Sequence, residues 1–240
     1  MRSHKRASSA SRADAHQLKG GWVFHSHDSV LIWVISIFLA IVLVLSVADF
    51  VLQDTSWQLK EISSQDTFGR MGRDEAITAH RQVVMYIVGK ATELPVAMTL
   101  DEKSHLTDVR VLVSRGMVSF MILCILLSIG GIAFFMMHDS KVRMSLFVRV
   151  VQRFTVALAI LIAILGIGAF TFSSSFDTFH EIFFPQGNWM FSPDSMLITL
   201  YPETFFLHSF LRVLGFSLGA VVIGFVSSVM LKRLMSVEHF

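Results

Sequence analysis

A histidine flanked by carboxylates precedes a long apolar run, in the stretch TLDEKSHLTDVR. Thr99 followed three residues later by Glu102 is a capping-box pattern, which predicts that a helix begins directly after Thr99. On that helix Asp101, Glu102 and Asp108 share a face with His105, because they lie three or four residues from it. Carboxylates within hydrogen-bond reach fix the tautomer of an imidazole and raise its basicity, as a general base requires. The alternative interpretation is a solvated, charged helix start.

A second histidine with a nearby carboxylate lies in the aromatic segment 173–204, where Asp177 and His180 stand three residues apart. This segment is too apolar to stand in water, and its prolines interrupt it too often for it to cross a bilayer. We therefore expect it to lie at the membrane interface as a lid. Ser192 before Pro193 predicts the start of a short helix. The aromatic residues of the segment are Phe176, Phe179, Phe183, Phe184, Trp189, Phe191 and Tyr201.

For four other residues the sequence gives weaker evidence of a functional role. His80 and His208 are expected to be interfacial or solvated. Arg212 stands one or two turns into an apolar run, where a cation is costly unless it reaches the interface or binds an anion or a polarised carbonyl. The single Cys124 lies within another apolar run and is expected to pack there, because alone it cannot build a disulfide or a cysteine-rich zinc site.

The composition is that of a membrane protein. Of the 240 residues 53% are hydrophobic and only 16% are charged, which is far from the balance of a soluble domain. Residues 30–48 are uncharged and long enough to cross about 30 Å of hydrocarbon as a helix. Three more such runs follow, at 117–137, 154–172 and 205–231. The expected fold class is all-α: a four-transmembrane-helix bundle with a mostly helical extracytoplasmic segment and an interfacial aromatic loop.

The distribution of lysine and arginine predicts the orientation of this bundle. Residues 1–29 and the loop 138–153 are rich in basic residues, whereas 173–204 has none. The positive-inside rule then puts both termini in the cytoplasm, with 1–29 as a disordered tail. In the membrane domain, residues 30–240, the segments 52–116 and 173–204 are expected to be extracytoplasmic.

Two helix faces can also be predicted. Residues 76–92 have helical spacing, and their apolar face would be Ile77, Val84, Ile87 and Val88. In the last apolar run Gly215 and Gly219 form a small-xxx-small pattern, which is typical of close helix packing in membranes.

The sequence lacks the motifs of several common enzyme classes. There is no G-x-S-x-G elbow, His180-Glu181 is not followed by the second histidine of a zinc protease, and no glycine-rich phosphate loop follows a strand. A net charge of +2 without a basic patch among aromatics gives no support to nucleic-acid binding. What remains is acid/base catalysis by histidine at a membrane surface, with neither a metal nor another cofactor.

Three motifs together resemble a known family. They are His105-x-x-Asp108-Val109 after an acidic turn, F-x-x-F-H at 176–180, and W-x-F-x-P-D-S-x-L-I-x-L-Y-P at 189–202. This pattern is similar to the bacterial four-helix membrane family that includes the lipoprotein intramolecular transacylase, Lit. The expected topology matches from residue 30 onward. The resemblance implies a multi-pass protein of the bacterial cytoplasmic membrane whose partners are a diacylglyceryl lipoprotein and membrane lipids.

The resemblance also implies a reaction. The N-terminal amine of a diacylglyceryl-cysteine lipoprotein attacks its own sn-2 ester and leaves a lyso-form lipoprotein. His105 and His180 would be base and acid in either order, since the sequence does not assign them. Under this hypothesis Asp108, Glu102 and Asp177 orient the imidazoles. Arg110 or Arg212 stabilises the oxyanion, and the aromatic loop with Trp189 and Tyr201 holds the acyl chains and excludes water.

Two alternatives from other classes remain open at this stage. The first is a non-catalytic sensor or assembly module that binds a ligand or a protein through its outer segments. The second is a haem or metal site built from histidine pairs, for which the runs 117–137 and 154–172 supply no histidine.

Overall fold

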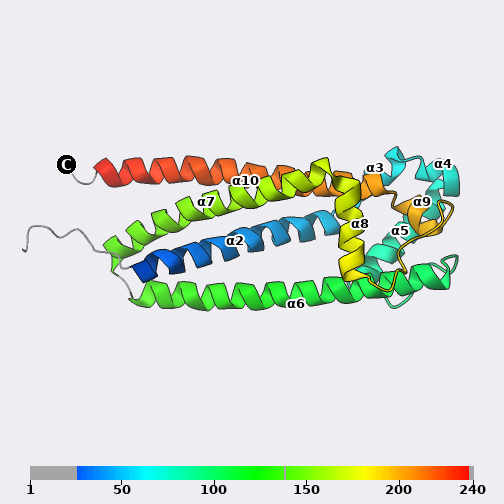
Figure 1. The fold of residues 1–240 in the computed structure, drawn as a ribbon, viewed down its shortest axis with the longest axis horizontal. Coiled ribbons are helices and arrows are strands. Elements are labelled where there is room, and N and C mark those ends of the chain that lie inside the picture. The colour runs from blue at the N-terminus through cyan, green and yellow to red at the C-terminus, as the bar shows by residue number, and fades with distance from the viewer. Residues whose placement is uncertain (1–25, 138, 238–240) are drawn as a thin grey trace, which may run out of the picture.

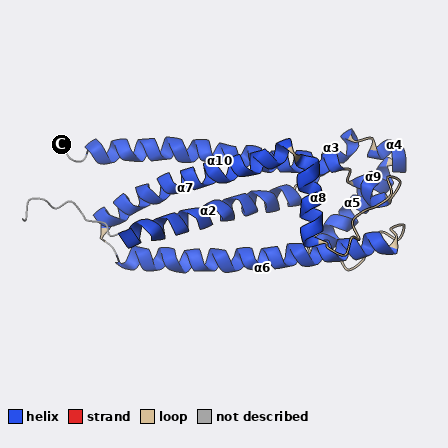
Figure 2. Cartoon of the chain, in the orientation of Figure 1, coloured by secondary structure: helices blue, strands red, loops and turns tan. Residues whose placement is uncertain are grey.

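The structure, a computed structural model, describes residues 26–137 and 139–237. Every regular element in this part of the chain is a helix, as Figure 2 shows, which confirms the all-α fold class. Four long helices run side by side (Figure 1), and each is long and apolar enough to cross a membrane. They are α2 (Ser26–Gln53), α6 (Leu100–Met137), α7 (Ser140–Phe170) and α10 (Glu203–Val237).

The short helices gather at one end of this bundle (Figure 1). The head, as we call this end, is formed by the first turns of α6 together with four short helices. These are α3 (Thr55–Ser64), α4 (Thr67–Met71), α5 (Arg73–Ile87) and α9 (Met196–Leu200). The start of α2, the connection from α6 to α7 and the end of α10 all lie at the opposite end. The expected tail, residues 1–29, falls almost wholly outside the described residues.

Helix α6 is one continuous helix that includes two predicted segments, the capped helix after Thr99 and the apolar run 117–137. It has 38 residues, so it is about 57 Å long at about 1.5 Å per residue. The hydrocarbon core of a bilayer is only about 30 Å thick. Because charged residues are confined to residues 100–116 of this helix, these turns extend beyond the membrane and carry His105 into the head.

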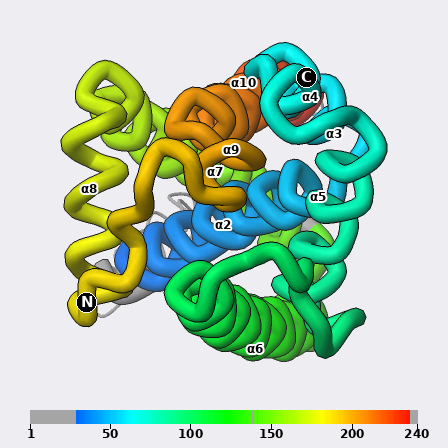
Figure 3. Tube along the Cα trace, turned by 90° about the vertical axis from the view of Figure 1, so that its right-hand side faces the viewer, coloured from blue at the N-terminus to red at the C-terminus, as the bar shows by residue number. Residues whose placement is uncertain are grey.

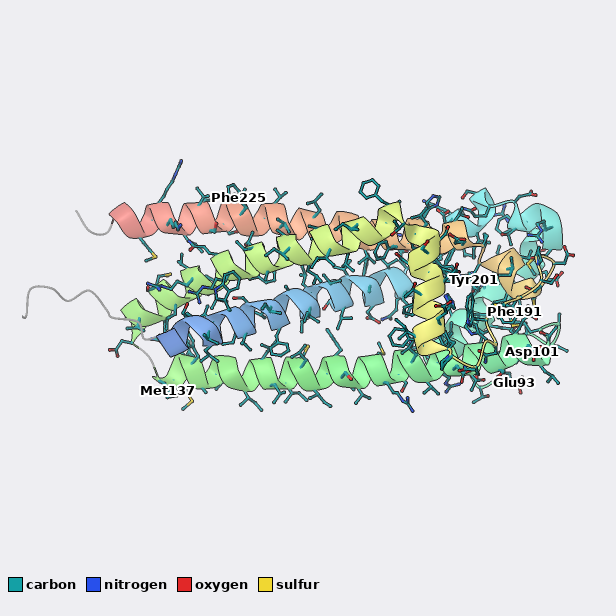
Figure 4. All side chains as sticks on the ribbon, viewed as in Figure 1. Glu93, Asp101, Met137, Phe191, Tyr201 and Phe225 are labelled. Carbon is teal, nitrogen blue, oxygen red and sulfur yellow. The ribbon has the colours of Figure 1, made fainter. Side chains whose placement is uncertain are left out.

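The head has a hydrophobic core of its own. Helix α5 contributes Ala76, Ala79, Val83 and Tyr86 to it, all of them buried. Of the predicted apolar face, Ile87 does pack against this core, but the prediction is wrong for Ile77 and Val84, which are half-buried and do not belong to it. Small alanines face the core because they let α5 approach its neighbours closely. Figure 4 places Tyr201 and Phe191 in the head, whereas Phe225 and Met137 lie on the long helices.

Close packing within the bundle centres on α7 and α10. A Cβ atom added at Gly224 would lie 2.5 Å from the Oγ1 atom of Thr155, so only glycine allows this approach. Nothing lies within 4 Å of such an atom at Gly215 or Gly219. The predicted packing role of those two glycines is wrong, because they face away from the neighbouring helices.

Helix α8 (Phe172–Phe183) crosses the end of the bundle. It runs from the end of α7 to the side of α6, as the views in Figure 1 and Figure 3 agree. The chain then folds back over the head to α9. The cap of α9 is Ser195, whose Oγ atom accepts a hydrogen bond of 3.2 Å from the backbone N–H of Ile198. The predicted start at Ser192 is three residues early, because Ser195 supplies the capping oxygen.

Candidate active site

The structure brings His105 of α6 and His180 of α8 together. Their ring centroids lie 5.9 Å apart and the planes are inclined by 26°, so the two imidazoles are stacked. Helix α8 makes this contact possible because it lies across the bundle and ends beside α6. The two residues, which we call the histidine pair, sit where the membrane-crossing part of the bundle meets the head.

His105 is almost enclosed, with 6% of its surface exposed. The rings of Phe184 and Phe191 lie 4.7 Å and 5.6 Å from its own. This burial, together with the neighbouring His180, lowers the pKa of His105 from 6.5 to about 4, against the opposing effects of Asp108 and Asn188. The imidazole is therefore neutral at pH 7. Its Nδ1 atom is buried and has no hydrogen-bond partner among the described residues.

His180 is half-buried and has a defined orientation. Its Nδ1 atom lies 2.7 Å from the carbonyl oxygen of Phe176. A carbonyl oxygen can only accept, so Nδ1 carries the proton and donates it, and in the neutral ring Nε2 has the free lone pair. The Trp189 ring packs 4.8 Å from this imidazole. The prediction that Asp177 orients His180 is wrong, because the backbone one helical turn back supplies the acceptor and Asp177 is exposed.

Asp108 connects α6 to the loop that follows α8. Its Oδ2 atom accepts hydrogen bonds from the side-chain amides of Gln186, at 2.8 Å, and Asn188, at 2.7 Å. The amide of Asn188 also donates to Ser104 at 3.3 Å. These bonds hold the loop that carries Trp189 and Phe191 against α6. Neither amide residue is identified by the sequence analysis; the only local signal is that they are polar within a mostly aromatic segment.

Glu102 has a structural role, because its carboxylate bonds to backbone groups of two segments. It is 1% exposed, and one oxygen accepts from the backbone N–H of Thr99 at 2.7 Å. In return the Thr99 hydroxyl accepts from the Glu102 N–H at 3.2 Å, which confirms the capping box. The other oxygen accepts from the backbone N–H of Leu197 at 2.8 Å. Both oxygens of Glu102 are thus used to join α6 to α9, and the prediction that this carboxylate orients an imidazole is wrong.

The two predicted oxyanion residues have protein partners elsewhere. Arg110 donates to the carbonyl oxygen of Ala91 at 3.0 Å and lies over the Tyr86 ring. Arg212 donates to Asp54 at 2.6 Å and lies over the Trp57 ring. Neither guanidinium contacts the histidine pair in the described chain.

Asp54, the carboxylate that binds Arg212, has a lowered pKa. A hydrogen bond from the backbone N–H of Trp57 lowers the pKa of Asp54, and Arg212 adds to this effect while partial burial opposes it. Asp54 therefore stays ionised and holds Arg212 at the junction of α2, α3 and α10. This ion pair explains how a cation is accommodated near the apolar part of α10.

Tyr201 lies in the core of the head with 9% of its surface exposed. Its hydroxyl shares a hydrogen bond of 2.9 Å with the Nδ1 atom of His80. His80 is completely buried, and burial lowers its pKa to about 4, with a smaller effect from Arg81. Burial also raises the pKa of Tyr201. The prediction that His80 is interfacial or solvated is wrong. His80 lies on the same face of α5 as the small residues that pack into the core of the head.

Apart from Asp177, which is exposed, the predicted site residues thus fall into two groups. His105, His180, Asp108 and Trp189 meet at one place, together with Asn188. Glu102, Arg110, Tyr201 and Arg212 hold the head together through bonds to other protein groups. Within residues 26–137 and 139–237, no three of histidine, cysteine, aspartate and glutamate come together as metal ligands would.

The fold is found in solved structures of another protein. A structure described as the membrane integral lipoprotein intramolecular transacylase Lit from Bacillus cereus superposes with a TM-score of 0.74 at 20% sequence identity, covering 88% of this chain and 98% of that one. A form with a histidine-to-arginine substitution gives a TM-score of 0.70 at 20% identity over 94% and 99% of the two chains. A histidine-to-alanine form gives 0.70 at 19% identity over 95% and 99%.

The sequence itself matches a family. No curated protein matches the chain, but the family model described as "Lipoprotein intramolecular transacylase Lit" matches residues 28–206. This match covers most of the membrane bundle and the whole head, including both members of the histidine pair. Membership in an enzyme family favours catalysis over the non-catalytic module considered above. The chain therefore belongs to the Lit family of lipoprotein intramolecular transacylases, and it is a multi-pass membrane acyltransferase.

Proposed function

We propose that this chain moves the sn-2 acyl chain of a diacylglyceryl-cysteine lipoprotein to that lipoprotein's own N-terminal amine, and that the histidine pair catalyses the transfer. Family membership supports the reaction class. The observation that carries the residue assignment is the stacking of His105 and His180, 5.9 Å apart, among aromatic rings at the head end of the bundle. Titratable groups brought together in this way are typical of acid/base sites.

His180 is the proton carrier in this proposal. Its Nδ1–H is committed to the Phe176 carbonyl, so Nε2 is the atom that can take a proton. An α-amine has a pKa of about 7.7–8.0, so a useful fraction is neutral and nucleophilic near pH 7. As its nitrogen attacks the ester carbonyl, Nε2 accepts the proton that the nitrogen loses. The proton then passes to the departing glyceryl oxygen.

His105 is the neutral partner. Because burial keeps its imidazole uncharged, it can donate an N–H hydrogen bond to the oxygen of the tetrahedral intermediate. This role replaces the one that Arg110 or Arg212 would have had, since both guanidinium groups are bonded elsewhere. One C–N bond forms, one C–O bond breaks, and the proton taken from the amine ends on the glyceryl hydroxyl. The cycle therefore needs no external acid, oxidant or cofactor.

The aromatic side chains around the pair would favour transfer to nitrogen over hydrolysis. Trp189 packs on His180, and Phe184 and Phe191 contact His105. A site enclosed by such rings excludes water and offers apolar surface to acyl chains. We assign Trp189 to substrate binding, while Asp108 and Asn188 position the loop that carries it.

The positive-inside rule places the head and the histidine pair at the outer leaflet, with both termini and the tail 1–29 in the cytoplasm. A diacylglyceryl lipoprotein anchored in that leaflet would present its N-terminus and its ester at the same depth. Helix α8 lies across the bundle there, as an interfacial helix would.

Mass spectrometry of lipoprotein N-termini tests the proposal, using cells that make the wild-type chain or the His105→Ala or His180→Ala form. We expect the lyso-form product with the wild type and unmodified diacylglyceryl lipoprotein with either variant. His208→Ala is the matched control, because His208 is an exposed histidine of α10 that pairs with Glu61 of α3. Unchanged lipoprotein with the wild type would overturn the activity. Normal product with both histidine-pair variants would overturn the residue assignment alone.

A further inference from the structure

A cavity of about 410 Å³ lies at the end of the bundle opposite the head, between the first part of α7 and the last turns of α10. Arg149 and Arg153 of α7 and Lys232 of α10 line it, and none of the described residues that line it is acidic. An anion that entered this cavity would therefore be attracted by three positive charges. The cavity is far along the bundle from the histidine pair, so the proposed acyl transfer does not use it.

One of these cations is held in position by α2. Arg153 donates to the carbonyl oxygen of Ser29 at 2.5 Å and to the Ser29 hydroxyl at 2.9 Å. Its guanidinium also lies over the Trp33 ring, 5.5 Å from the centroid. The side chain is thus fixed before any ligand arrives, and a guanidinium remains charged at all physiological pH values. A preorganised cation loses little side-chain entropy when it binds an anion.

One of the lining residues, Gln152, also has an unused hydrogen-bond donor. The Nε2 atom of Gln152 is buried and has no acceptor in the part of the chain that the structure describes. A buried donor without an acceptor is costly and marks a place where a ligand or an ion belongs. If the Gln152 side chain turned toward the cavity, a phosphate oxygen there would accept from this amide while it paired with the neighbouring cations.

The surface beside the cavity is apolar. Met144 and Phe147 of α7 and Leu234 of α10 expose 48%, 51% and 64% of their surfaces. An inorganic anion makes no favourable contact with these apolar side chains, whereas the acyl chains of a lipid would pack against them. Basic residues also predict that this end of the bundle is cytoplasmic, where the leaflet is rich in anionic lipids. We propose that this cavity binds the phosphate headgroup of an anionic phospholipid, whose acyl chains lie along α7 and α10.

Native mass spectrometry of the full chain in detergent tests this proposal, with phosphatidylglycerol, phosphatidylethanolamine and inorganic phosphate as probes. We expect saturable binding of one phosphatidylglycerol, and much weaker binding of the zwitterionic lipid. Lys232→Gln should weaken binding about fivefold, the effect of one Lys or Arg charge beside an anionic lipid surface. Lys232→Arg should retain it, because the charge remains.

Two further variants separate the cavity from general surface charge. Arg233→Gln removes the same charge from the neighbouring position of α10, which does not line the cavity, and should leave the affinity unchanged. Ser145→Phe keeps every charge but fills the cavity, and should abolish saturable binding. Equal weakening by Lys232→Gln and Arg233→Gln, or full competition by inorganic phosphate at equal concentration, would overturn the proposal.

Discussion

Two buried histidines of the head, His105 and His80, have nearly the same electrostatics and different surroundings. Both are at most 6% exposed, and burial lowers the pKa of each to about 4. His80 is bonded to the Tyr201 hydroxyl inside the hydrophobic core of the head. His105 instead stacks on a second imidazole that is partly exposed.

A strongly lowered histidine pKa therefore does not by itself indicate catalysis. Desolvation is the main cause at both positions, and it acts on any buried imidazole. What distinguishes His105 is that its titratable neighbour is a partly exposed imidazole, whose Nε2 lone pair has no partner among the described residues. Access and an adjacent proton acceptor separate a reactive histidine from a structural one.

The largest expected effect is on the rate of acyl transfer in His180→Ala. Loss of a positioned general base typically reduces a rate by about 10²–10⁴, while stability should change little because His180 is half-buried in a surface helix. Mass-spectrometric rate assays with purified enzyme and a diacylglyceryl lipopeptide measure this effect. Added imidazole should restore part of the activity. A rate within threefold of the wild type would remove His180 from the mechanism.

The opposite outcome is expected for His80→Ala. This change leaves a cavity in the head core and leaves the Tyr201 hydroxyl without its partner, which together should lower the free energy of unfolding by about 2–5 kcal/mol. The rate per folded molecule should stay within a few-fold of the wild type, since His80 does not touch the histidine pair. Chemical denaturation in detergent, with His208→Ala as the exposed control, checks the stability. A folded His80→Ala protein without activity would contradict this division of roles.

Acid should destabilise the head through both buried histidines. Each has a folded-state pKa of about 4 and an ordinary pKa of 6.5, so between these values the unfolded chain binds protons that the folded chain does not. Stability is therefore unaffected above pH 6.5 and falls as pH decreases toward 4, by at most about 1.4 kcal/mol per pH unit for each histidine. His80→Leu should remove the contribution of His80 from the slope of unfolding free energy against pH. An unchanged slope in unfolding measured from pH 7 to pH 4 would show that His80 is protonated in the folded state.

Local patterns in the sequence predict the parts of this molecule that local physics determines. Uncharged runs predict the bundle, and Thr99 with Glu102 predicts the first turn of α6, because both depend on neighbours in the chain. The F-x-x-F-H motif and the acidic turn before His105 predict the two residues of the histidine pair. Even so, spacing misidentified the group that orients His180, since a backbone carbonyl has no signature in the sequence.

Contacts between distant segments account for the remaining differences. The partners Arg212 and Asp54, His80 and Tyr201, and Glu102 and the Leu197 N–H are each far apart in the sequence. Their meeting depends on how the head folds over the bundle. A histidine among alanines and valines on α5 reads as an exposed polar position until the buried face of that helix is known.

The smallest expected effect is at Asn188 and Gln186, the two loop residues that have no recognisable motif in the sequence. Asn188→Ala removes a hydrogen bond to Asp108 and also the side chain whose interaction raises the pKa of His105, so that pKa should fall further. Gln186→Ala removes the exposed bonds from this amide to Asp108 and to Asn188 but keeps the Asn188 side chain, so it should leave the pKa of His105 unchanged and cost about 0.5–1.5 kcal/mol of stability. NMR titration of selectively labelled histidine in detergent separates the two variants, with the His80 signal as an internal reference. Equal shifts of His105 and His80 in Asn188→Ala would mean that the substitution loosens the whole head, whereas a shift of His105 alone would show that the loop adjusts this histidine and not the one bonded to Tyr201.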